Sequence, residues 1–222
     1  MKCRRRLSLI VKFKQYRWIP IIFFKVFHRI SFYGCENIPS TGPVIVAPNH
    51  ISYYDPVFAC LGITRDVEFM AWGRLFSIPI LRGMIRFLGA FPVETTKMDK
   101  SAYINAIRAL NNGKVLMLFP EGKRSADGEV KEFKLGIARI AFKANAKVVP
   151  VTIAGVYEAW PKHRLLPRPR KISVYYHKPI SIDKCNFKDS KAKHDFFNNV
   201  SNQIRDVIVG KLEEIKKGKR NG

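Results

Sequence analysis

The chain of 222 residues is long enough for one large α/β domain or two small ones, and its 47% of hydrophobic residues can build a sizeable core. The formal net charge of +23 is extreme for this length, so we expect an anionic partner: nucleic acid, an acidic membrane surface or a phosphorylated substrate. The four cysteines, Cys3, Cys35, Cys60 and Cys185, are far apart and include no C-x-x-C pair. This spacing argues against a structural zinc site and a disulfide framework, and it favours free thiols in a reducing cytoplasm.

Residues 1–33 form a distinct N-terminal segment, in which basic residues are interleaved with large apolar ones and no acidic residue occurs before Glu36. This pattern predicts amphipathic helices that lie in a membrane interface and meet anionic lipid; a helical cap on a soluble core is the alternative. Pro20 interrupts the segment, so we expect two short helices rather than one. The segment has two apolar stretches, at 7–11 and 18–24. Each is too short for a signal-peptide core or a transmembrane helix. The expected membrane-binding residues are Arg4, Arg5, Arg6, Lys12, Lys14, Arg17, Trp18, Phe23 and Phe24.

Residues 34–222 alternate between strand-like and helix-like stretches. Such alternation predicts a single α/β domain with a central, mainly parallel sheet flanked by helices. The domain opens with a linker rich in Gly, Pro and Ser at 34–43, and Pro92 marks an edge strand because it cannot donate to a ladder. We expect strands at 44–47, 67–71, 89–94, 115–119, 148–153 and 172–176. We expect helices at 55–61, 78–87, 100–111, 135–144 and 192–217.

The turn between the first strand and the first helix of this domain carries His50 and Asp55. Sheet proteins tend to place chemistry at such turns, and histidine has an unperturbed pKa close to neutral pH. A nearby carboxylate can fix the histidine tautomer and stabilise the imidazolium, so His50 is a candidate general base that Asp55 orients. The alternative is structural, because Ser52-x-x-Asp55 also has the spacing of a helix capping box.

A second polar turn follows the strand at 115–119, at residues 120–125. Lys123 and Arg124 could hold a phosphate, Gly122 lets the backbone approach a ligand, and the hydroxyl of Ser125 adds a contact. The alternative is an ordinary charged turn in which Glu121 pairs with a neighbouring cation. A base at one turn and a phosphate site at the other favour proton removal from a hydroxyl of a phosphorylated substrate, followed by attack on an acyl carbonyl.

Together the two motifs resemble the glycerolipid acyltransferase family, and most closely its bacterial 1-acylglycerol-3-phosphate acyltransferase type. The motifs are Asn49-His50-x-x-x-x-Asp55 and Phe119-Pro120-Glu121-Gly122-Lys123-Arg124-Ser125. Residues 89–93 and 149–151 resemble the second and fourth motifs of the family, and residues 133–139 resemble the segment after the third. The resemblance covers about residues 34–180.

The resemblance implies direct transfer of a fatty acyl chain from acyl-CoA or acyl-carrier protein to the hydroxyl of lysophosphatidic acid, giving phosphatidic acid. It implies that His50 is the general base, that Asp55 orients it, and that Glu121, Gly122 and Arg124 help to bind the acceptor. It further implies work at the cytoplasmic face of the membrane, as a peripheral or monotopic protein, without a metal or prosthetic group.

One position departs from the family pattern, because Thr95 stands where the second motif usually has an arginine that contacts the acceptor phosphate. Lys97 could substitute, but as a point charge rather than a planar fork. Another lysophospholipid or glycerol 3-phosphate therefore remains an alternative acceptor. Two further alternatives stay open: an inert lipid-binding module on the same fold, and a nucleic-acid-binding protein, although no zinc-finger or aromatic RNA-binding signature supports the latter.

Overall fold

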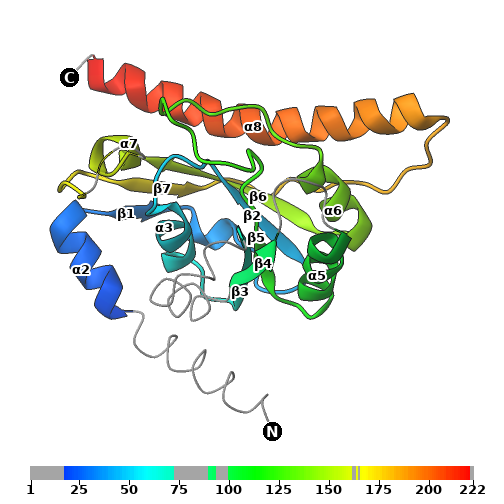
Figure 1. Cartoon of the computed structure of the whole chain (residues 1–222), viewed down its shortest axis with the longest axis horizontal. Coiled ribbons are helices and arrows are strands. Elements are labelled where there is room, and N and C mark those ends of the chain that lie inside the picture. The colour runs from blue at the N-terminus through cyan, green and yellow to red at the C-terminus, as the bar shows by residue number, and fades with distance from the viewer. Residues whose placement is uncertain (1–17, 73–89, 94–99, 162–163, 165, 221–222) are drawn as a thin grey trace, which may run out of the picture.

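The computed structural model describes residues 18–72, 90–93, 100–161, 164 and 166–220 (Figure 1). Its strands are β1 (Ser31–Tyr33), β2 (Val44–Pro48), β3 (Val67–Trp72), β4 (Ala90–Val93), β5 (Val115–Met117), β6 (Lys147–Ala154) and β7 (Ser173–Tyr176). Its helices are α2 (Trp18–His28), α3 (Asp55–Leu61), α5 (Lys100–Asn111), α6 (Gly136–Ala144), α7 (Val156–Ala159) and α8 (Ser190–Arg220), with a 3-10 turn η1 (Cys35–Asn37).

All of these strands belong to one sheet in the order β1-β7-β6-β2-β5-β3-β4. The strands from β6 to β4 are mutually parallel, whereas β7 runs antiparallel to β6 and β1 runs parallel to β7. Parallel strands have their carboxyl ends at the same edge of a sheet. Because β2 and β5 are neighbours, the two polar turns that follow them lie side by side.

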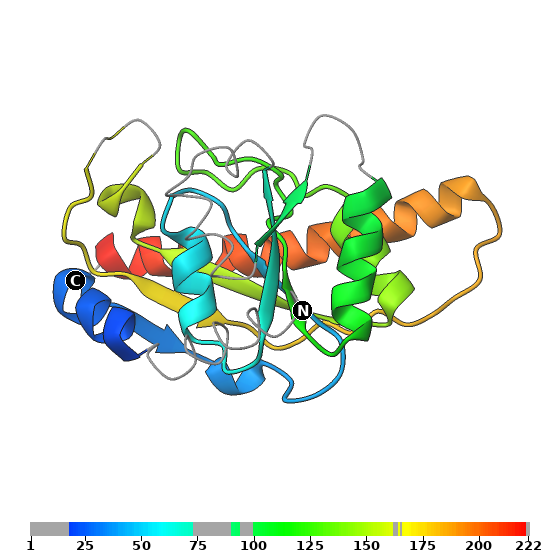
Figure 2. The same cartoon turned by 60° about the horizontal axis from the view of Figure 1, so that its bottom comes forward.

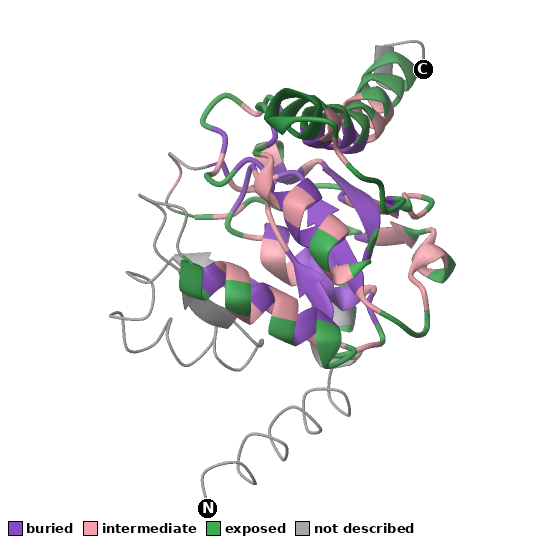
Figure 3. Ribbon diagram, turned by 90° about the vertical axis from the view of Figure 1, so that its right-hand side faces the viewer, coloured by how far each residue is buried: buried purple, intermediate pink, exposed green. Residues whose placement is uncertain are grey.

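The two faces of the sheet bury different helices, since successive residues of a strand point to opposite sides. Val44 and Val46 of β2 join a core cluster that contains α3 residues such as Phe58. Ile45 and Ala47 join the opposite cluster, which α5, α6 and α8 cover. Figure 3 shows the buried residues concentrated in the sheet and on the helix faces turned toward it, while the outer face of the long α8 is exposed.

The structure confirms the single α/β domain and its mainly parallel sheet, and β4 is the edge strand that Pro92 predicts. α7 and the edge strand β1 were not predicted, because both are too short to show a periodic pattern. Residues 31–33, assigned to the N-terminal segment, therefore belong to the sheet. Gly34, expected in a linker, passes so close to β7 that a Cβ atom would lie 2.2 Å from the carbonyl oxygen of Tyr176.

Smaller differences concern element ends. β5 ends at Met117 rather than at residue 119, and α8 continues to Arg220 rather than to residue 217. The helix predicted at 78–87 lies outside the described residues.

α2 is described from Trp18 to His28 and runs through Pro20 without a break. The first of the two short helices predicted for this segment lies outside the described residues. Phe24, predicted to bind the membrane, instead packs inward on Tyr54 and Phe58, with ring centroids 5.6 Å and 5.0 Å apart. Among the described residues, no helix combines the length and apolar content needed to cross a bilayer.

Candidate active site

The turn after β2 is fixed to the neighbouring strand β6 by Asn49. Its side-chain amide nitrogen donates to the Ile153 carbonyl oxygen at 3.1 Å, and the Ile153 N–H donates to its amide oxygen at 2.8 Å. Asn49 is fully buried, so these two bonds satisfy polar groups that water cannot reach. The next residue, His50, is consequently presented at the carboxyl edge of the sheet from a rigid support.

His50 and Asp55 form a hydrogen-bonded pair, with His50 Nδ1 and Asp55 Oδ2 3.0 Å apart. The same carboxylate oxygen accepts the backbone N–H groups of Ile51 at 2.6 Å and Ser52 at 2.7 Å. Asp55 is buried, and the amides hold its carboxylate in place. An ionised carboxylate only accepts hydrogen bonds, so Nδ1–H is the donor to Asp55, and in the neutral imidazole this leaves Nε2 as the nitrogen that can accept a proton.

Half of the capping box that Ser52 and Asp55 could form is present. Asp55 accepts the Ser52 N–H, as the acidic residue at position N3 of such a box does. The Ser52 hydroxyl accepts the Tyr54 N–H at 3.3 Å rather than the N–H of Asp55, and it donates to the Trp160 carbonyl oxygen at 2.8 Å. The structural and chemical interpretations of Asp55 are thus compatible, since one carboxylate oxygen serves both the turn and the histidine.

The turn after β5 is joined to the first turn by backbone and side-chain hydrogen bonds. Ser125 N–H donates to the His50 carbonyl oxygen at 2.8 Å, and His50 N–H donates to Glu121 Oε1 at 2.7 Å. Glu121 Oε2 accepts the backbone N–H of Lys131 at 3.0 Å. Glu121 therefore binds main-chain amides rather than a neighbouring cation, and it connects three segments of the chain.

Burial raises the pKa of Glu121 above its ordinary value, and hydrogen bonds from the Lys131 and His50 backbones oppose part of this rise. Both carboxylate oxygens accept from amide donors, which favours the charged form. Burying the Glu121 carboxylate costs solvation energy, and the hydrogen bonds from the two amides offset part of this cost. The geometry of the turn therefore depends on these hydrogen bonds.

Two aromatic rings complete the site. The Phe119 ring stacks on the His50 imidazole with centroids 4.0 Å apart and planes inclined by 26°. The guanidinium carbon of Arg124 lies 3.7 Å from the centroid of the Tyr53 ring, and Tyr53 in turn lies beside Trp160 at 5.2 Å. The imidazole is thus confined on one face, and the cation is held by an aromatic platform.

The structure brings together the predicted residues of both turns. Gly122 has a left-handed φ of 74°, which glycine adopts without strain. The Lys123 side chain is exposed. The Ser125 hydroxyl donates to Asp127 Oδ1 at 2.7 Å and accepts the Gly128 N–H, so it closes its own loop.

Several predicted residues cannot be placed in this site. Lys97, Thr95 and the basic residues of the first 17 positions lie outside the described residues, as does the side chain of Trp18. The alternative acceptor contacts of Lys97 therefore stay a prediction.

Sequence reasoning missed Tyr53, Phe119 as a ring against His50, and Trp160. Tyr53 and Phe119 both lie within the two motifs, and this position could have identified them. Trp160 lies more than 100 residues after the first turn, and only the fold places it there. In the described parts of the chain, no group of three or more His, Cys, Asp or Glu side chains is placed to hold a metal ion.

Comparison with known proteins finds acyltransferases similar to this chain. The chain is 29% identical over 190 residues to a 1-acyl-sn-glycerol-3-phosphate acyltransferase of Borreliella burgdorferi, covering 85% of this chain and 73% of that protein. It is 29% identical over 173 residues to a chloroplastic 1-acyl-sn-glycerol-3-phosphate acyltransferase of Arabidopsis thaliana, covering 75% of this chain and 48% of that protein. The chain thus spans about half the length of the plant relative.

A solved structure is similar over nearly the whole fold. The crystal structure of the 1-acyl-sn-glycerophosphate acyltransferase of Thermotoga maritima matches 97% of this chain and 84% of that chain, with a TM-score of 0.71 and 29% sequence identity.

Fold and site together define an α/β protein with a carboxylate-oriented histidine at the carboxyl edge of its sheet. The model of the family described as Acyltransferase matches residues 29–154, which is more than half of the chain and includes both turns. The chain belongs to the acyltransferase family, as the two motifs predicted.

Proposed function

We propose that this chain transfers a fatty acyl group from acyl-CoA or acyl-carrier protein to the free hydroxyl of 1-acyl-sn-glycerol-3-phosphate, giving phosphatidic acid. The names of the similar proteins support the acceptor and product, since these proteins act on this glycerophosphate. The observation that carries the chemistry is the 3.0 Å contact between His50 Nδ1 and Asp55 Oδ2.

In this mechanism His50 Nε2 takes the proton of the acceptor hydroxyl while the hydroxyl oxygen attacks the thioester carbonyl of the donor. The carbon–sulfur bond breaks as the new ester bond forms, and the proton passes from the imidazolium to the departing thiolate. Asp55 stabilises the imidazolium through Nδ1, and no covalent acyl-enzyme is formed. We expect this reaction to need no metal or prosthetic group.

Arg124 is the proposed anchor for the acceptor phosphate. Its guanidinium stacks on Tyr53 beside the histidine turn, and its buried Nη1 has no hydrogen-bond partner among the described residues. A buried cationic donor without a partner is costly unless a ligand supplies an acceptor. Lys123, and Lys97 in the undescribed segment, would add positive charge. Thr95 keeps another lysophospholipid or glycerol 3-phosphate as the second candidate acceptor.

We further propose that residues 1–33 bring the protein to anionic lipid at the cytoplasmic face of the cell membrane, as a peripheral or monotopic protein. The exposed apolar side chains of α2 and the acid-free sequence of this segment support this location.

The test is acyl transfer by the purified protein. Acyl-CoA and acyl-carrier protein are each offered with lysophosphatidic acid, glycerol 3-phosphate and other lysophospholipids. His50→Ala should lower kcat by at least about 10²-fold, the lower range for removal of a general base. His194→Ala removes a histidine that is exposed on α8 and is the matched control.

The outcomes separate the candidates. Phosphatidic acid formed by the unmodified protein and by His194→Ala, but not by His50→Ala, supports both the reaction and the base. Transfer only to a different acceptor supports the mechanism and identifies Thr95 as the reason for the changed acceptor. If the protein binds vesicles but transfers no acyl group to any acceptor, the result supports an inert lipid-binding module rather than an enzyme.

A further inference from the structure

Two acid-free stretches of the sequence come together in the fold. No Asp or Glu occurs before Glu36, and none occurs between Glu158 and Asp183. α2 lies in the first stretch, and the loop between α7 and β7 lies in the second. A hydrogen bond of 3.0 Å from Ser31 N–H to the Ile172 carbonyl oxygen joins the ends of these two segments. The two segments therefore share one end of the molecule, at the left of Figures 1 and 2.

The outer face of α2 is apolar. Ile22, Phe23 and Val26 are 53%, 57% and 78% exposed, respectively. Lys25 and Arg29, which are also exposed, flank this apolar row with positive charge. Large side chains exposed side by side, and rimmed by cations, suit an apolar surface with an anionic boundary.

The loop between α7 and β7 repeats this combination. Leu166 is 71% exposed, and the side chains of Arg168, Arg170 and Lys171 are exposed after it. No ion pair joins these cations to a carboxylate within the described parts of the chain. One exposed leucine among unpaired cations is the pattern of a loop that enters a lipid headgroup layer.

Two hydrogen bonds connect described residues of this loop to the end of α7. The Trp160 indole N–H donates to the Arg164 carbonyl oxygen at 3.0 Å, and Arg168 N–H donates to the Ala159 carbonyl oxygen at 2.8 Å. A main-chain position that such a bond already holds loses less conformational entropy when the surface docks, so the side chains beside it contribute more of their contact energy to binding.

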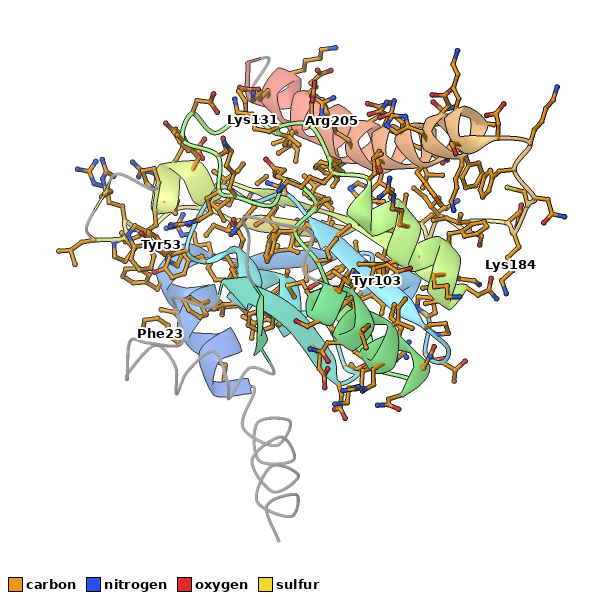
Figure 4. The ribbon with its side chains drawn as sticks, turned by 45° about the vertical axis from the view of Figure 1, so that its right-hand side comes forward. Phe23, Tyr53, Tyr103, Lys131, Lys184 and Arg205 are labelled. Atoms are coloured by element: carbon orange, nitrogen blue, oxygen red, sulfur yellow. The ribbon has the colours of Figure 1, made fainter. Side chains whose placement is uncertain are left out.

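α2 and the loop between α7 and β7 both pack directly on residues 49–55, the catalytic turn that carries His50. The Tyr54 ring lies between them, with centroids 5.6 Å from Phe24, 5.0 Å from His28 and 4.8 Å from Trp160. In Figure 4, Phe23 on α2 and Tyr53 on the catalytic turn lie at the same end of the molecule. A surface that contacts both elements would therefore lie beside the turn that carries His50.

We propose that Arg164, Leu166, Arg168, Arg170 and Lys171, the basic loop, form a second lipid-contacting element that seats the catalytic turn on an anionic bilayer together with α2. Leu166 enters the boundary of the acyl region, and the cations meet lipid phosphates. A single interfacial helix leaves the protein free to roll about the helix axis, whereas two separate contacts fix one orientation. This binding goes beyond the proposed acyl transfer and is measurable without it.

The test is vesicle sedimentation with the full chain at fixed ionic strength. The vesicles are phosphatidylcholine alone, or phosphatidylcholine with about 30% phosphatidylglycerol, which supplies the negative surface potential. The charge-reversal variant Arg168→Glu/Arg170→Glu is compared with Lys184→Glu/Lys191→Glu. The control changes the net charge equally at exposed positions, and Figure 4 shows Lys184 at the opposite end of the molecule.

We expect Arg168→Glu/Arg170→Glu to weaken binding to the anionic vesicles about ten-fold or more, and the control about two-fold or less. Leu166→Ser should weaken binding to both kinds of vesicle. Thermal unfolding of each variant verifies that it is folded. Equal losses in the two charge-reversal variants, or unchanged binding of Arg168→Glu/Arg170→Glu, would overturn the proposal, because bulk charge or α2 would then suffice.

Two readouts keep this inference distinct. With a dispersed short-chain acceptor, Arg168→Glu/Arg170→Glu should keep the unmodified transfer rate, and its rate should fall only with vesicle-borne acceptor. If the protein transfers no acyl group but still binds vesicles through the basic loop, the proposed function is wrong and this inference is supported. A loss confined to duplex DNA binding, with vesicle binding intact, would assign the loop to nucleic acid and overturn the proposal.

Discussion

The guanidinium carbon of Arg124 lies 3.7 Å from the ring centroid of Tyr53, so a residue of the second turn stacks on a residue of the first. This contact adds to the backbone bond between Ser125 and His50. The planar fork of Arg124 is therefore aligned by the same seven-residue turn that carries the histidine. A phosphate held by this fork would keep a fixed position relative to the imidazole.

Tyr53→Ala should raise the acceptor KM about two- to ten-fold and leave kcat nearly unchanged, because an exposed cation–π contact is worth about 0.5–1 kcal/mol and a desolvated one more. Tyr53→Phe keeps the ring and should behave like the unmodified protein. Steady-state kinetics with varied acceptor check this. A fall in kcat at constant KM in Tyr53→Ala would show that Tyr53 serves the histidine turn rather than Arg124.

Asp55→Asn should lower kcat by about 10²–10⁴-fold, since the amide cannot stabilise an imidazolium as a carboxylate does. The carboxylate oxygen Oδ2 also accepts two backbone N–H groups, so unfolding by urea should be followed in parallel. Asp206→Asn, at an exposed position on α8, is the control for loss of one negative charge. If Asp55→Asn stayed folded and kept most of its kcat, the orienting role would be wrong.

The pairing of His50 with Asp55 could be predicted because both residues belong to one turn and stand five positions apart. The sequence also predicted that the second turn follows a strand of the same mainly parallel sheet, but only the structure shows that β2 and β5 are neighbours. What could not be predicted were the contacts that depend on side-chain direction across long separations. The stacking of Arg124 on Tyr53 and the bond from Ser52 to Trp160 are of this kind.

The N-terminal segment illustrates the same limit. Composition indicates an amphipathic helix, but Phe23 and Phe24 are chemically identical, and only the phase of the helix decides which one faces outward. The three residues of β1 carry no periodic signal, and the partner strand β7 lies some 140 positions later. Tertiary pairing, not local sequence, therefore defines where the sheet begins.

Glu121→Gln should both slow the reaction and destabilise the protein by about 1–3 kcal/mol. The carboxylate accepts the N–H groups of His50 and Lys131 with separate oxygens, whereas a glutamine offers one acceptor and one donor. One of the two buried amides would lose its partner. Urea unfolding and kcat measure the two effects. The exposed Glu129→Gln variant controls for charge, and equal stability of the two variants would contradict the bridging role of Glu121.

His28 should make the stability of the protein depend on pH below neutrality. It is fully buried against Phe24, Tyr54 and Phe58, and burial lowers its pKa below the ordinary value of 6.5, while the nearby Arg170 backbone opposes part of that shift. At pH values near and below 6.5 the unfolded chain binds a proton that the folded chain excludes. The free energy of unfolding must therefore decrease as the pH falls through this range.

Replacing His28 with Phe keeps an aromatic ring between α2 and Tyr54 and removes this proton. The free energy of unfolding, measured with urea at pH 5.5 and pH 7.5, should fall more on acidification in the unmodified protein than in His28→Phe. Burial also lowers the pKa of His177, but that residue contributes equally to both proteins and cancels in the comparison. Identical losses in the two proteins would mean that the α2 interface opens without protonating His28.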